Sequence, residues 1–146
     1  MPPLTIRVPV PHNYVFPHGA LFLSVDKQVD FDRLREADNQ ARDDAGVPIW
    51  VVKVMDLDPA AGRFNRSTEI KVKIASPVEP QPPATLVPGY PPAVMFTDVT
   101  ITPYTDSTGC KGNRTPHNCR ARLAWSIRAT GMTEPTGQAL PASAVA

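Results

Sequence analysis

The sequence predicts a mainly β protein with at most one short helix. Residues 49–56 and 119–131 alternate apolar and polar side chains with the period of two that a half-buried strand requires. Eighteen prolines among 146 residues argue against a mainly helical chain, because proline removes a backbone donor and blocks helix interiors. The content of 42% hydrophobic and 20% charged residues is that of a globular domain.

The first third of the chain predicts an arm, one strand and a polar segment. Residues 1–17 hold five prolines and predict an extended arm. Residues 19–25 are apolar enough for a mostly buried first strand. Residues 31–44 are polar and carry a thin apolar stripe with helical spacing, so they predict either a short surface helix or a charged loop.

The middle of the chain predicts three more strands. In residues 49–56 and 69–75 the alternate apolar side chains face inward and the lysines face outward. Residues 76–92 contain seven prolines, which exclude a central strand and predict a polyproline-like connector across the domain. Residues 94–104 return to β character, with valine and isoleucine inward and threonine and tyrosine outward.

The last predicted strand, residues 119–131, alternates so strictly that its two faces can be named. One face is apolar and carries Trp125, which we expect in the core together with Trp50. The other face carries arginines and no carboxylate. The inward residues are Ala121, Leu123, Trp125, Ile127 and Ala129, and the outward arginines are Arg120, Arg122 and Arg128.

Five strands with one long connection between the third and fourth predict a small, partly open barrel of the OB type, with a β-sandwich as the alternative. Residues 18–132 would form this single β-barrel domain behind the arm. Residues 133–146 are small and polar and predict a disordered tail.

The charge is balanced overall but uneven along the chain. The formal net charge is +1, so no global field attracts the protein to nucleic acid or membrane. Residues 1–48 hold 5 Lys and Arg against 7 Asp and Glu, whereas residues 49–131 hold 10 against 6, so an anion site belongs to the second part. The sequence contains neither an apolar run of about 18 residues nor a signal pattern at its start, so we expect a cytoplasmic protein without a membrane partner.

The outward cations of separate strands predict one positively charged surface, provided that these strands are neighbours. Such a surface suits the backbone of a single-stranded nucleic acid, and exposed aromatic rings beside it would stack on bases. An ordinary solvated sheet face has the same pattern and needs no ligand. The candidate residues are Lys53, Arg63, Phe64, Arg66, Lys71, Lys73, Tyr104, Arg120, Arg122 and Arg128, with Tyr104 and Phe64 as the stacking aromatics.

No catalytic or cofactor pattern is present in the sequence. It lacks a glycine-rich phosphate loop after a strand, GxSxG and HExxH, so we expect a protein that is not an enzyme and has no cofactor. Cys110, His117 and Cys119 are three local ligands where a structural zinc needs four, so we expect no metal. In a cytoplasm we expect Cys110 and Cys119 to be unpaired thiols, and a disulfide between them would form only under oxidation.

Four segments of the sequence, taken in order, carry a resemblance to a known family. They are 15–32, 46–59, 69–76 and 95–106, the last running on to 122–132. Together they resemble the actinobacterial proteins named plasmid replication, integration and excision activators, which are encoded on integrative and conjugative elements and related prophages. The ending is also similar to small single-stranded-DNA-binding-like proteins of conjugative elements. Residues 107–119 look like an insertion relative to this pattern, and the tail lacks the acidic tip of housekeeping single-strand-binding proteins.

The resemblance implies a non-enzymatic accessory role in the replication or excision of a mobile element. In one hypothesis the protein binds single-stranded DNA through the outward cations, with replication or excision proteins of the element as further partners and self-association left open. In the other it is a protein-interaction adaptor or regulatory activator that uses residues 76–92 for docking and does not bind DNA directly. A duplex-reading activator is disfavoured because no helix-turn-helix pattern is visible.

Overall fold

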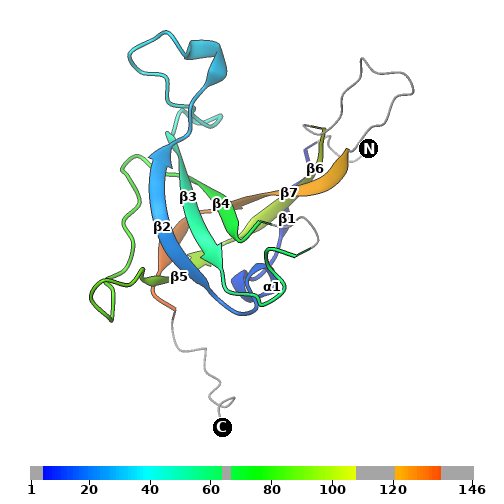
Figure 1. The fold of residues 1–146 in the computed structure, drawn as a ribbon. Coiled ribbons are helices and arrows are strands. Elements are labelled where there is room, and N and C mark those ends of the chain that lie inside the picture. The colour runs from blue at the N-terminus through cyan, green and yellow to red at the C-terminus, as the bar shows by residue number, and fades with distance from the viewer. Residues whose placement is uncertain (1–4, 64–66, 108–120, 136–146) are drawn as a thin grey trace.

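A computed structural model describes residues 5–63, 67–107 and 121–135, which form a mainly β structure whose single sheet curves into a half-barrel (Figure 1). Along this sheet the strand order is β1-β6-β7-β4-β3-β2-β5-β8, and β4 and β7 are the parallel pair among otherwise antiparallel neighbours. The strands are β1 Val8–Pro9, β2 Ala20–Lys27, β3 Ile49–Asp56, β4 Glu69–Ala75, β5 Ala93–Thr97, β6 Thr100–Asp106, β7 Arg122–Ala129 and β8 Gly131–Thr133.

The two strands with the clearest alternation, β3 and β4, begin and end where the sequence predicts them. Val52 lies directly opposite Val72, and both are fully buried. Burial of one face and solvation of the other fixes the register, because a slip by one residue would exchange the two faces. The core is completed by residues of β2, β5 and β7 and by the segments beside them. Its buried members are Phe16, Ala20, Val52, Val54, Val72, Ile74, Val94, Phe96, Val99, Ile127 and Ala129.

The strand predicted at residues 94–104 is divided into β5 and β6 by a bend at Asp98. Asp98 has a φ of 49°, in the left-handed region that aspartate tolerates better than most residues. Its carboxylate accepts a hydrogen bond from the Thr130 hydroxyl at 3.1 Å, which ties the bend to the end of β7. The bend allows one continuous segment to pair with β2 through β5 and with β7 through β6.

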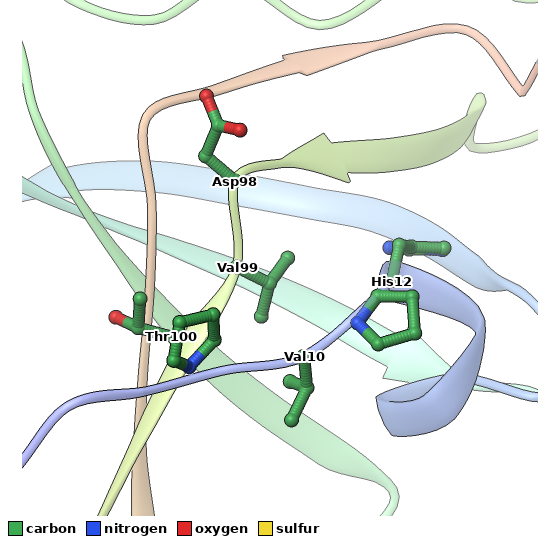
Figure 2. A pocket seen from close by; sticks show the side chains of 7 residues that line it. Val10, His12, Asp98, Val99 and Thr100 are labelled. Carbon is green, nitrogen blue, oxygen red and sulfur yellow. The ribbon is translucent and has the colours of Figure 1, made fainter.

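The N-terminal arm joins the fold, whereas the sequence predicts only an extended segment. Strand β1 pairs with β6, and the N–H of Val10 donates to the carbonyl of Val99 at 3.0 Å. The short helix α1, His12–Val15, then places Phe16 in the core. Figure 2 shows the shallow pocket where this arm crosses the bend, with Val10, His12, Asp98, Val99 and Thr100 around it.

His12 connects α1 to β5. Its Nδ1 accepts a hydrogen bond from the backbone N–H of Phe96 at 3.1 Å, and its ring centroid lies 5.2 Å from that of Phe16. Burial lowers the pKa of His12, because desolvation disfavours the imidazolium form. A protonated Nδ1 could not accept the hydrogen bond, so the fold requires the neutral ring.

Acid should therefore destabilise the protein through His12. Because the folded-state pKa lies below the ordinary value of 6.5, the unfolded chain takes up the proton first, and this stabilisation is complete above about pH 6.5 and lost as the pH falls through the folded-state pKa. We expect His12→Asn, which keeps an acceptor but does not titrate, to lose less free energy of unfolding between about pH 7.5 and about pH 5. Urea denaturation at both values measures this, and equal losses would contradict the assignment.

Residues 28–48 form a long loop that projects from the β2–β3 end of the sheet, rather than the short helix that was one of the two alternatives (Figure 1). A single 3-10 turn, Phe31–Arg33, is capped by the Asp30 carboxylate, which accepts from the N–H of Asp32 at 3.0 Å. Isolated bridges pair Val29 with Gln40 and Arg42 with Pro48. The apolar stripe of residues 31–44 does not form a packed helix face, since Phe31 and Leu34 are exposed.

The expectation that Trp125 lies in the core is wrong. Strand β7 pairs with β4 only from Ile127 to Ala129, whereas its first part pairs with β6 alone, so the two strands project as a hairpin beyond the core. Trp125 stands on that projection and is 49% exposed. Trp50, the second residue of β3, is only half-buried and does not belong to the core, and its indole N–H donates to the Ser76 carbonyl at 2.9 Å.

Candidate functional site

The outer face of the sheet carries four cations in two directly opposed cross-strand pairs. Lys53 of β3 lies opposite Lys71 of β4, and Lys73 of β4 lies opposite Arg128 of β7. Their neighbours along each strand point into the core, so alternation turns all four side chains to the outside. The parallel β4–β7 pairing therefore brings together residues that are more than fifty positions apart in the sequence.

A fifth cation extends this row across the sheet. Arg7 lies just before β1. Burial lowers the pKa of Arg128, and the charge of Arg7 lowers it further. Because β1 pairs with β6 and β6 with β7, the arm delivers Arg7 to the Arg128 end of the row. We call Lys53, Lys71, Lys73, Arg128 and Arg7 the cationic strip.

The positive charge of the cationic strip is not neutralised by close ion pairs. Burial lowers the pKa of Lys73, and the charges of Arg128 and Lys71 lower it further. None of the strip cations makes an ion pair within 4.0 Å in the described part of the chain. Like charges directly opposite on a sheet destabilise it, so the pairs Lys53–Lys71 and Lys73–Arg128 cost stability that a bound anion would recover.

Carboxylates approach the strip at its ends. Glu69 occupies the outer face at the start of β4, and Asp43 and Asp44 raise the pKa of Arg128, against the effects of burial and Arg7. Asp43 is occupied within its own loop, since its carboxylate accepts from the N–H groups of Ala45 at 3.0 Å and Val47 at 2.8 Å. A shallow pocket opens between these groups, lined by Arg7, Arg42, Asp43, Asp44, Ala45, Ile49 and Arg128.

Tyr104 lies on the same outer face as Arg128, but farther along the hairpin. It stands opposite Ala124 and is 50% exposed. It lies four positions after Thr100, the partner of Arg128, which corresponds to about 13 Å along the strand. The ring is accessible for stacking at one end of the strip rather than within it.

Arg122 is paired with a carboxylate, although the outward face of its own strand carries none. It lies opposite Asp106 of β6, and its Nε is 3.4 Å from the Asp106 carboxylate. The sequence could not show this pairing, because the carboxylate belongs to another strand. Arg122 is therefore ion-paired and contributes less free charge than Lys73 or Arg128.

The remaining predicted residues do not join the strip in the described structure. Arg63 is exposed in the β3–β4 loop, beyond the end of the two strands where Glu69 faces Met55. Phe64, Arg66 and Arg120 lie outside the described residues, as do Cys110, His117 and Cys119. Arg7 is the residue that sequence reasoning missed, and no local signal could have found it, because its place depends on the pairing of a two-residue strand.

Comparisons with known proteins find no match: no family model, curated protein or solved structure resembles this chain at a significant level. Across residues 5–63, 67–107 and 121–135, no three His, Cys, Asp or Glu side chains gather as a metal site would require. The same ranges contain no helix with the length and apolar character needed to cross a bilayer.

Proposed function

We propose that this chain is a non-enzymatic accessory protein of a mobile element or prophage, which binds single-stranded DNA in replication or excision. The observation that carries the DNA part of the proposal is the cationic strip, which crosses β3, β4, β7 and β1 without close ion pairs. Spaced cations on a sheet surface hold successive phosphates, and an exposed ring such as Tyr104 stacks on a base. The accessory role rests on the four sequence segments that resemble the replication, integration and excision activators.

The strand arrangement supports an OB-like interpretation of the half-barrel. If β5 and β6 are taken as one strand bent at Asp98, the principal strands are β2, β3, β4, β5/β6 and β7. In OB folds the second and third strands form the face that binds oligonucleotides. Here those strands are β3 and β4, which carry Lys53, Lys71 and Lys73.

The length of the strip sets the expected footprint. It spans five strands in the order β3-β4-β7-β6-β1, or about 19 Å at about 4.8 Å per strand. That distance accommodates a few nucleotides, near the lower end of the roughly 4–16 nucleotides that OB folds cover. Five phosphate contacts at about 0.7 each give an upper bound of about 3.5 for the slope of log affinity against log salt.

Fluorescence anisotropy with a labelled single-stranded oligonucleotide, titrated with salt, tests this proposal. We expect binding without strong sequence preference, a salt slope of about 2 to 3.5, and weaker binding to a duplex of the same length. The labelled strand should be recovered uncut, as a non-enzymatic role requires. Absence of binding at low salt, or a salt slope near zero, would reject the nucleic-acid proposal.

A second candidate, the protein-interaction adaptor, is favoured by a structured apolar tip on the proline-rich connector. Leu86 is 93% exposed, and Tyr90 is largely exposed. The tip is held by the Thr85 hydroxyl, which lies 2.8 Å from the carbonyls of both Val87 and Tyr90. Capture of an element protein that is lost in Leu86→Ala, together with no oligonucleotide binding at low salt, would favour this function over the first.

A further inference from the structure

The projecting hairpin presents a second surface on the side opposite to Tyr104. In the barrel this side faces the core, as Ile127 and Ile101 do. Past the end of the β4–β7 pairing, no strand in the described residues pairs with β7 on its β4 side. Large apolar side chains are exposed on this part of the hairpin, with Leu123 at 66% and Trp125 at 49%.

The neighbouring strands continue this apolar surface. Pro103 lies opposite Trp125 on β6, and Val8 lies opposite Ile101 on β1, so both share its side of the sheet. Ile6, two residues before Val8, is also exposed. We call Ile6, Val8, Pro103, Leu123 and Trp125 the apolar hairpin face. Contiguous exposed apolar patches of this kind mark interaction surfaces.

The chemistry of this face does not suit a nucleic acid. Its members and their cross-strand neighbour Thr105 carry no charge, whereas the strip cations stand on the other side of the same strands. A phosphate backbone crossing the apolar hairpin face would therefore meet no cation from the described strands. An uncharged apolar surface is instead self-complementary, because two copies that meet through it bring no like charges together.

We propose that the apolar hairpin face is the contact between two copies of this chain, independently of the proposed function. A two-fold contact uses the same patch on both copies, with Trp125 and Leu123 as its central anchors. Packing these inner sides together leaves each cationic strip on the outside of the pair, which avoids electrostatic repulsion. The contact consists of few side chains, so the pair should form in a concentration-dependent way.

Contact through the face is favoured over pairing of edge strands. Strand β1 ends the sheet, and a free edge can accept another strand. The N–H of Val10 points to β6, so the alternate position, Pro9, would supply the donor at the free edge, and proline has none. The edge is blunted, whereas the apolar hairpin face beside it remains open.

Sedimentation equilibrium of the full chain over a range of concentrations tests this inference. We expect wild type to move from the mass of one chain to that of two, and Leu123→Glu to weaken the pair at least about tenfold. Leu34→Glu is the matched control, because it makes the same substitution at an exposed leucine of the β2–β3 loop, and it should associate as wild type does. Since Leu123 is exposed in the single chain, its replacement should leave thermal unfolding of the monomer unchanged.

Tryptophan fluorescence distinguishes a second copy of the chain from other occupants of the apolar hairpin face. In a Trp50→Phe background Trp125 is the remaining tryptophan, and its emission should shift to shorter wavelength as the protein concentration rises. A single-chain mass at every concentration, or association that Leu123→Glu leaves intact, would overturn the inference. Quenching of Trp125 by an oligonucleotide without any change in mass would also overturn it, by identifying a base as the occupant.

Discussion

Replacing Lys73 and Arg128 together by glutamine should weaken binding of single-stranded DNA about 25-fold at about 0.1 M salt. Each lost phosphate contact removes about 0.7 from the salt slope, so losing two should lower the slope by about 1.4. At about 0.1 M salt, one decade below 1 M, the logarithm of the affinity then falls by about 1.4, which is a factor of about 25. Salt-titrated anisotropy with one oligonucleotide measures both quantities.

The same double variant should be as stable as wild type, or more stable. Lys73 and Arg128 are directly opposed, and each side chain is partly desolvated. Removing both charges relieves their repulsion, which contributes roughly 0.2–1 kcal/mol for a cross-strand pair. Weaker DNA binding together with an unchanged or higher free energy of unfolding would identify these charges as functional rather than structural.

A matched control separates position from net charge. Lys27 at the end of β2 and Arg35 in the β2–β3 loop are exposed and lie outside the strip. Lys27→Gln with Arg35→Gln removes the same two charges and should leave the salt slope within about 0.3 of wild type. If both double variants weaken binding equally, the strip is not the path of the strand and only the overall charge matters.

Alternation in the sequence predicted the middle of the sheet because each strand there has one buried and one solvated face. It set the bounds of β3 and β4 and the outward direction of Lys53, Lys71 and Lys73. It did not reveal β1 or β8, because strands of two and three residues carry too little pattern. The predicted five-strand count therefore differs from the eight strands of the described sheet.

Trp125 and Arg122 show a different limit of sequence reasoning. Alternation assigns a side chain to a face, but only the pairing of the whole sheet decides whether that face is covered. Because β7 pairs with β4 only from Ile127 onward, Trp125 stays exposed on a face that looks like core in the sequence. Likewise, the carboxylate that pairs with Arg122 comes from Asp106, which only the β6–β7 register brings opposite it.

Replacing Phe16 by alanine should lower the free energy of unfolding by about 3–5 kcal/mol, the largest stability effect we expect in this chain. Phe16 is 2% exposed and packs against the rings of His12 and Phe96, with centroids 5.2 and 6.0 Å away. Its removal leaves a cavity between α1 and β5 that neighbouring side chains cannot fill completely. Such a loss is a large part of the roughly 5–15 kcal/mol that holds a domain folded.

Urea denaturation of Phe16→Ala, with Phe16→Leu as the milder variant and Tyr14→Ala as control, measures this effect. Tyr14 is an aromatic residue of the adjoining helix α1 but is 71% exposed, so its loss should change stability by less than about 0.5 kcal/mol. The folded Phe16→Leu variant should also bind DNA with a slightly smaller salt slope, because Phe16 anchors the arm that carries Arg7 to the strip. A loss below about 1 kcal/mol in Phe16→Ala would mean that the arm is not part of the core, and Arg7 would then lose its place in the strip.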